Sequence, residues 1–225
     1  ELVAKGVTFG RITANPDGTM DVSKVEGVDS DLIIKPFMQK GAFVSLREFS
    51  VKAMNQHFGM QAVERFQDGI DADRDGVVDE LTRGDITALV LYQATLPVPG
   101  RSIPSQGAAK LAAERGSELF ATLGCVFCHV PALRLDSPVF TEPNPFNPPD
   151  KLQVGDVSNP FSVDLTQHGE LPRLRPRFDG SVMVPAFTDL KRHDMGDLLN
   201  NESREQEGIK TEQWLTRKLW GFASE

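Results

Sequence analysis

The pentapeptide Cys125-Val126-Phe127-Cys128-His129 carries more information about fold and function than any other stretch of this chain. It contains both cysteines of the 225-residue sequence, so a framework of several disulfides is excluded. Two thiols at this spacing can each form a thioether with a vinyl group of one porphyrin, and the adjacent imidazole then lies beneath the iron. The spacing therefore predicts covalent haem c at Cys125 and Cys128, with His129 as the proximal iron ligand.

A redox-active dithiol and half of a zinc site are the other chemistries open to a C-x-x-C sequence. Zinc needs further ligands, and the chain has no other cysteine. A thioredoxin-like dithiol opens a helix, whereas here an Ala-, Leu- and Glu-rich stretch at about 107–123 predicts a helix that Gly124 ends before the motif. Haem attachment is the favoured interpretation. It predicts an exported bacterial protein of the periplasm, because c-type cytochromes mature outside the cytoplasm.

The ligand opposite His129 would decide what the iron can do. A thioether suits electron transfer, whereas an open position suits reaction with peroxide. The downstream candidates are Met183, Met195, His168 and His193. Met195 is favoured, because a helical break at 193–196 could aim its sulfur inward, and a methionine packed in the core is the plain alternative. His193 is the next candidate, as a ligand or as a partner of a haem propionate.

The acidic stretch 71–80 is similar to a calcium-binding loop. Oxygen ligands at alternate positions can surround a hard cation, and Gly76 permits the sharp turn that such loops need. The candidate ligands are Asp71, Asp73, Asp75, Val77 and Asp79. The last position of the pattern holds Thr82 instead of a bidentate glutamate, so Asp79, Glu80 or Asp85 would have to complete the shell. The pattern predicts a structural Ca²⁺ site, with a solvated acidic turn as the alternative.

Capping signatures and prolines organise the rest of the chain. Ser45-x-x-Glu48 predicts an amphipathic helix that runs to about Phe66 and is weakened at Gly59. Thr82-x-x-Asp85 predicts a second helix that runs to about Thr95. Short strands are expected around 7–12, 32–35 and 162–166, and the proline-rich stretch 131–149 is expected to be irregular. The stretch 97–106 is typical of a linker and divides the chain into segments 1–100 and 101–225.

Composition narrows the functional classes. Hydrophobic residues make up 40% of the chain and charged residues 25%, as in ordinary soluble globular proteins. No apolar run approaches the roughly 18 residues that cross a bilayer, so no transmembrane segment is predicted. With 24 basic and 32 acidic residues the net charge is -8, which repels phosphate backbones and argues against nucleic-acid binding. An acidic surface favours salt-sensitive docking to a basic redox protein.

Several segments form an ordered set that is more specific than the cysteine motif. They are 31–37, 46–49, 59–64, 71–85, 91–94, 125–129, 193–196 and 214–221. This set resembles the bacterial di-haem oxidoreductase family, whose members are peroxidase relatives of the di-haem cytochrome c peroxidases. The resemblance implies a mostly α fold, in which cytochrome c-like helical domains carry long irregular loops. Segment 1–100, with its acidic loop, would be a partial domain of this kind, and 101–225 would be a haem-binding one.

The resemblance also implies a division of labour between two haems. Cys125, Cys128 and His129 would match the second haem motif of the family. The first motif would lie before Glu1, so a second haem would be bound by residues absent from this chain. One haem would relay electrons, and the other would meet peroxide or another small oxidant. No residue stands out as catalytic.

Three functions follow from these features. The first is a peroxidase-type haem oxidoreductase that transfers electrons through covalently bound haem. The second is a pure electron-transfer cytochrome c module with no substrate of its own. The third is a calcium-dependent binding domain with a vestigial haem. The coordination of the iron discriminates between the first two, and partner binding after loss of haem would favour the third.

Overall fold

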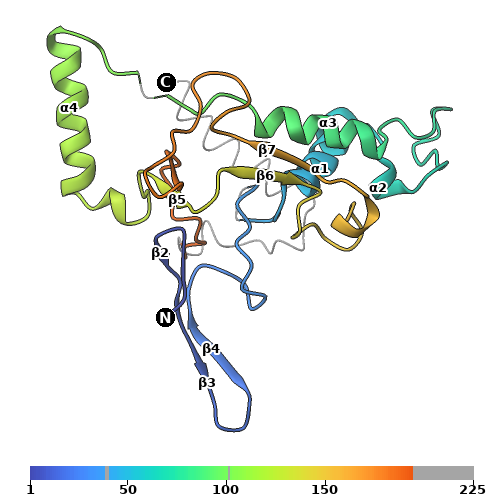
Figure 1. Ribbon diagram of the computed structural model, residues 1–225, viewed down its shortest axis with the longest axis horizontal. Coiled ribbons are helices and arrows are strands. Elements are labelled where there is room, and N and C mark those ends of the chain that lie inside the picture. Colours follow the sequence, from blue (N-terminus) through green and yellow to red (C-terminus); the bar gives the residue numbers. More distant parts are fainter. Residues whose placement is uncertain (39–40, 101, 195–225) are drawn as a thin grey trace.

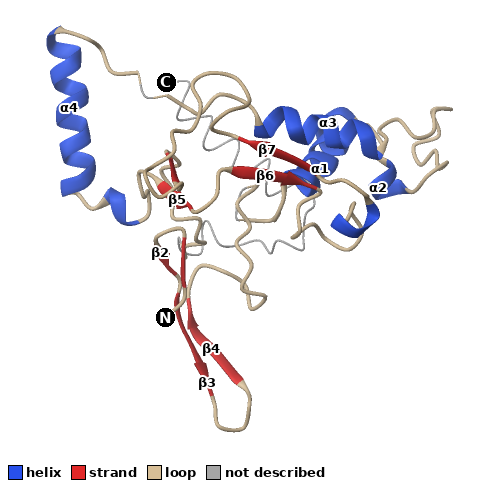
Figure 2. Cartoon of the chain, viewed as in Figure 1, coloured by secondary structure: helices blue, strands red, loops and turns tan. Residues whose placement is uncertain are grey.

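The computed structural model describes residues 1–38, 41–100 and 102–194. This part of the chain contains four α-helices and eight short strands, joined by long irregular loops (Figures 1 and 2). None of the described helices combines the length and the apolar character needed to cross a membrane. Met195 and the segment 214–221 lie outside the described residues.

The predicted mostly α, cytochrome c-like fold is wrong. The helices are α1 (Leu46–Phe58), α2 (Val63–Phe66), α3 (Arg83–Ala94) and α4 (Gly107–Thr122), with short 3₁₀ turns η1 (Cys125–Phe127) and η2 (Val154–Asp156). The strands form four two-stranded antiparallel sheets. They pair β1 (Val3–Ala4) with β2 (Val7–Thr8), β3 (Gly10–Ala14) with β4 (Met20–Val25), β5 (Leu133–Leu135) with β8 (Val182–Val184), and β6 (Val139–Glu142) with β7 (Phe161–Asp164). The chain after the cysteine motif forms hairpins and loops because its prolines interrupt helices and its short apolar runs pair as strands.

The helix starts follow the capping signatures. Ser45 accepts the amide of Glu48 at 3.2 Å at the start of α1. Thr82 and Asp85 form a reciprocal capping box at the start of α3, so the predicted second helix is confirmed. The first predicted helix is two helices in the structure, because Gly59 adopts φ +74° and ends α1 well before Phe66.

The buried core lies between helices and one hairpin. Val51 of α1 packs with Ala62 and with two residues of α3, Ile86 and Val90, and Phe140 of β6 covers this group. Figure 1 shows β6 and β7 running beside α1 and α3. The core is therefore shared by the two predicted segments, since β6 follows the 97–106 stretch and α1 and α3 precede it.

Two elements project from the core. α4 lies at the opposite end of the molecule from α1–α3 in Figure 1, and none of its side chains is buried by the described residues. The β3–β4 hairpin extends away from the rest of the chain in the same view. Because α4 leads directly into η1, the cysteine motif is presented at the edge of the described structure.

Candidate functional site

The cysteine motif lies at the end of α4, as predicted. The helix ends at Thr122, and Gly124 takes a left-handed conformation with φ +82° that turns the chain into η1. This conformation favours glycine, and a Cβ at Gly124 would lie 3.2 Å from the ring of the exposed Phe127. The amide of His129 donates to the carbonyl of Cys125 at 2.9 Å and closes the turn.

The imidazole of His129 is oriented by a backbone carbonyl from a distant part of the sequence. Its Nδ1 lies 3.1 Å from the carbonyl oxygen of Phe187. A carbonyl can only accept, so Nδ1 carries the proton and Nε2 keeps its lone pair. The ring also packs against Phe120, with ring centroids 6.1 Å apart. This is the arrangement of a metal-binding histidine, in which a backbone carbonyl orients the ring and leaves the other nitrogen for the metal.

Large apolar side chains are exposed on the elements that carry the motif. Phe127 is 82% exposed and Leu123 is 75% exposed, and Leu119 and Phe187 are exposed as well. The two cysteines are not in a disulfide, and Cys128 is the more exposed of the two. Apolar surface of this kind marks a region that a ligand or a partner covers. The thiols, the imidazole and the apolar surroundings thus fit a covalently attached porphyrin.

A second group of side chains meets the motif at Cys128. Its Sγ, a carboxylate oxygen of Asp189 and a ring nitrogen of His193 all lie within 4.8 Å of one another. His193 Nε2 lies 2.8 Å from Asp189 Oδ2, and the amide of Lys191 donates to Asp189 Oδ1 at 2.9 Å. Asp189 is only 4% exposed. The structure therefore brings His193 into the group at Cys128, and His168 is not among its members.

The other predicted distal ligands that the structure describes have contacts of their own. Met183 is in β8, where it pairs with Arg134 of β5. His168 places its Nδ1 3.2 Å from the carbonyl of Asp164. Met195 lies outside the described residues. Asp189 was not identified from the sequence, although its spacing to His193, four residues on, is a signal that could have found it.

Three of the predicted calcium ligands converge. Carboxylate oxygens of Asp71, Asp73 and Asp75 lie within 4.8 Å of one another. Asp71 accepts the amides of Arg74 at 2.6 Å and Gly76 at 3.0 Å. Desolvation acts to raise the pKa of Asp71, but these backbone hydrogen bonds hold the pKa below its ordinary value. The loop therefore keeps the Asp71 carboxylate ionised. It also places the three aspartate carboxylates around a common centre.

The remaining predicted ligands have other contacts. Asp79 Oδ1 accepts the amide of Gly69 at 2.7 Å, and the amide of Val77 donates to Asp75 Oδ1 at 2.8 Å. The carboxylate of Glu80 accepts the amide of Gln61, and Asp85 belongs to the cap of α3. Among the described residues, the convergent acidic group is thus limited to the first three aspartates of the loop.

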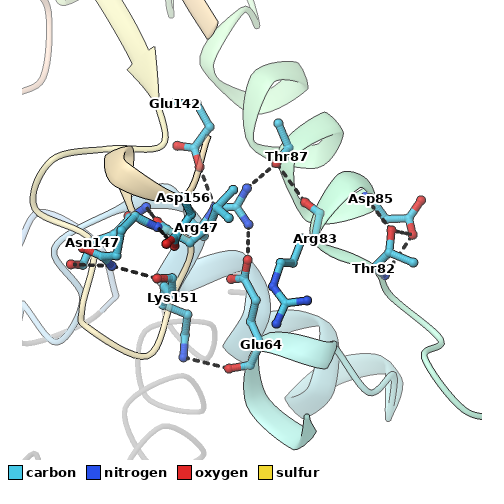
Figure 3. Close-up of polar contacts among 12 residues, drawn as sticks. Arg47, Glu64, Thr82, Arg83, Asp85, Thr87, Glu142, Asn147, Lys151 and Asp156 are labelled. Atoms are coloured by element: carbon cyan, nitrogen blue, oxygen red, sulfur yellow. Dashed lines mark hydrogen bonds and ion pairs between the residues drawn. The ribbon is translucent and has the colours of Figure 1, made fainter. Parts of the chain in front are cut away.

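A buried ionic cluster lies in the core, where α1, α2, α3 and β6 meet (Figure 3). Arg47 of α1 is fully buried. Its Nη1 donates to Glu64 Oε1 of α2 at 2.5 Å, and its Nε donates to Glu142 Oε1 of β6 at 2.5 Å. Its Nη2 donates to the hydroxyl of Thr87 in α3. One guanidinium therefore ties together three helices and one strand, a role that the sequence pattern did not indicate.

The cluster holds more negative than positive charge. Glu64 Oε2 and Glu142 Oε2 are buried and have no hydrogen-bond partner among the described residues. Burial raises the pKa of Glu64, and the Arg47 guanidinium opposes this shift only in part. The cluster is a structural junction centred on the Arg47 guanidinium, with Lys151 beside Glu64.

The geometry thus offers two places for chemistry: the cysteine motif with its neighbours from 187–193, and the acidic loop between α2 and α3. The first combines thiols with imidazoles and suits a prosthetic group or a soft metal ion. The second offers only oxygen ligands and suits a hard cation. Comparison of the chain with protein-family models, with curated proteins and with solved structures gave no match.

Proposed function

We propose that this chain carries haem c on Cys125 and Cys128, with His129 Nε2 as the proximal iron ligand, and that it transfers electrons as part of a peroxidase-type di-haem oxidoreductase. The observation that supports this most is the hydrogen bond between His129 Nδ1 and the carbonyl of Phe187. It orients the imidazole and leaves Nε2 available at the position where a C-x-x-C-H motif needs a ligand. Haem would supply the one-electron chemistry when bound.

The surroundings of the motif support the same proposal. Leu119 and Leu123 are one helical turn apart on α4, and both are exposed together with Phe127. Packing against a porphyrin would remove these side chains from water, at about 25 cal/mol for each Å² of apolar area. Thioether formation takes place outside the cytoplasm, so the proposal includes export to the bacterial periplasm. The proposed partners are a basic redox protein and peroxide or another small oxidant.

Haem content and iron spectra test this proposal. The full chain is produced with export and cytochrome c maturation, and haem that stays with the polypeptide after denaturation is measured. One haem per chain is expected, with none on the double variant Cys125→Ser/Cys128→Ser. The variant Glu118→Gln, on the exposed face of α4, is the matched control and should keep full haem content. Absence of covalent haem from the exported parent chain would falsify the proposal.

The same sample separates the enzyme from the alternative electron-transfer module. A high-spin component that reacts with peroxide would indicate an open iron position and support the peroxidase. A low-spin spectrum with a methionine–iron charge-transfer band, unchanged by peroxide, would indicate a pure electron carrier. In that case Met195→Ala should abolish the band.

As a second candidate function, we propose that the loop 71–80 binds a structural Ca²⁺. The convergence of Asp71, Asp73 and Asp75 within 4.8 Å favours this role. Calcium at 100 times its dissociation constant should raise the free energy of unfolding by about 2.7 kcal/mol. Thermal unfolding with Ca²⁺ and with a chelator measures this. Asp73→Asn should abolish the difference, whereas Asp68→Asn, an exposed carboxylate just before the loop, should preserve it.

A further inference from the structure

The side chains of Cys128, Asp189 and His193 form a mixed sulfur, oxygen and nitrogen donor set. We propose that the haem-free chain binds one Zn²⁺ through these three residues, with a fourth position open to water. This inference is independent of the proposed haem function, because it concerns the chain before any thioether has formed.

The donor set selects zinc over the harder cations. Zinc binds cysteine thiolate, histidine nitrogen and carboxylate oxygen in tetrahedral sites, and three protein ligands leave one position open. Calcium and magnesium take oxygen ligands and do not favour a thiolate. The aspartates at 71–75 offer only oxygen and would not compete for zinc at this site.

The buried carboxylate of Asp189 supplies the electrostatic reason for a cation. Asp189 is 4% exposed, and its carboxylate contacts the backbone amide of Lys191 and the ring of His193. A carboxylate removed from water needs a compensating charge. A divalent ion between Asp189 and Cys128 would meet that need, while His193 would change from hydrogen-bond partner to ligand.

The backbone around the cluster is anchored without the metal. The carbonyl of Phe187 binds His129, the amide of Arg192 donates to the carbonyl of Gly27 at 2.8 Å, and the ammonium of Lys191 lies over the ring of Phe9. These contacts hold 187–192 beside the motif. Zinc–ligand bonds of about 2.0–2.3 Å place tetrahedral donors about 3.5 Å apart. The donors, now within 4.8 Å, therefore need to shift relative to one another by only about 1 Å, with the closely spaced Asp189 and His193 atoms moving slightly apart.

Zinc and haem c would exclude each other at Cys128. A sulfur bonded to a porphyrin side chain is no longer a thiolate, so zinc would have to leave before haem is attached. The zinc site therefore belongs to the haem-free form, and each proposal can fail without the other.

The test uses the full chain produced without haem maturation. Zinc is titrated calorimetrically, and Co²⁺ is added as a spectroscopic probe whose thiolate-to-metal absorption reports a sulfur ligand. One zinc per chain and a cobalt–thiolate band are expected. His193→Gln and Asp189→Asn should weaken zinc binding by more than about 10-fold, because loss of an outer partner alone costs that much. His168→Gln, an exposed histidine outside the group, is the matched control and should bind as the parent does.

Two outcomes overturn the proposal. Absence of zinc binding by the parent chain does so directly. Binding that is lost in Cys125→Ser or His129→Gln, but is unchanged in His193→Gln and Asp189→Asn, would assign zinc to the C-x-x-C-H motif alone. Cys128→Ser, which removes the proposed sulfur ligand, should lose the cobalt–thiolate band. Circular dichroism of each variant shows whether it folds. If Cys128→Ser does not fold, Asp189→Asn and His193→Gln still test the site.

Discussion

Arg47 is the residue on which the core depends most. It is fully buried and bonds Glu64 and Glu142, and the second carboxylate oxygen of each has no hydrogen-bond partner among the described residues. Removing one partner of a buried ion pair leaves uncompensated charge, which typically destabilises by 3–5 kcal/mol, so Arg47→Met should lower the free energy of unfolding by about 3–5 kcal/mol. Urea unfolding measures this. The matched control is Arg83→Met, whose exposed pair with Asp68 should be worth less than about 1 kcal/mol. Equal losses in the two variants would contradict the assigned role of Arg47.

Glu64 should make the stability of the chain depend on pH. Burial raises the pKa of Glu64 above its ordinary value of 4.5, so the folded chain holds this proton more tightly than the unfolded chain does. The contribution of this group is fully present below about pH 4.5 and is lost as pH rises through the folded pKa. Relative to the parent, Glu64→Gln should gain on the order of 1 kcal/mol as pH rises through that window. Urea midpoints measured from pH 4 to pH 8 test this, and a difference that does not change with pH would refute it.

The residue scale also shows what a sequence can and cannot reveal about a site. The motif Cys125–His129 was identifiable because its chemistry lies in neighbouring residues. The sequence offered only the spacing of Asp189 to His193 as a signal, since the relation of Asp189 to Cys128 exists only after distant segments have met. Arg47 was not identifiable, because a lone arginine in a helix is most often exposed and its burial depends on partners from three other elements.

At the scale of elements, local signals predicted the helix ends well. Thr82 and Asp85 cap the start of α3, as the pattern indicated. Gly124, in a left-handed conformation, stops the helical path of α4 before the cysteine motif, also as indicated. The sheets were harder to predict, because β5 and β8 are three residues long and too short for a clear alternating pattern. The strand expected at 32–35 is a loop, whereas strands expected around 7–12 and 162–166 are present in part. The sequence pattern predicted only a weakened position at Gly59, whereas the helix ends there.

α4 should contribute little to the stability of the haem-free chain. Its Leu111 is 67% exposed, whereas Ile86 of α3 is fully buried in the core. Ile86→Ala should therefore destabilise by about 2–5 kcal/mol, and Leu111→Ala by less than about 0.5 kcal/mol. Urea unfolding gives both values. Amide exchange should be fast along α4 and slow in α1 and α3, because an isolated helix of this length is marginal in water. Strong protection of α4 in the haem-free chain would contradict this description.

At the scale of the whole molecule, the predicted fold class failed for a physical reason. The resemblance implied helical domains, and helices do form where a capping box is present, as in α3, or where good helix formers are concentrated, as in α4. The chain between the motif and residue 187 has prolines and short β-branched runs that favour hairpins, and one of these, β6–β7, closes the core. The fold therefore depends on pairing between distant segments, which helical periodicity in a single sequence does not report.

Net charge should govern how the whole chain meets a protein partner. At a net charge of -8, a basic redox protein is attracted over distances comparable with the Debye length, about 30 Å at 0.01 M salt and about 8 Å at 0.15 M. The second-order rate of electron transfer with such a partner should fall at least about tenfold across this range, because steering is screened. Stopped-flow spectroscopy of the haem-loaded chain measures the rate. The reaction with uncharged peroxide is the internal control and should not change with salt. A partner rate that is equally insensitive would exclude electrostatic docking through the acidic surface.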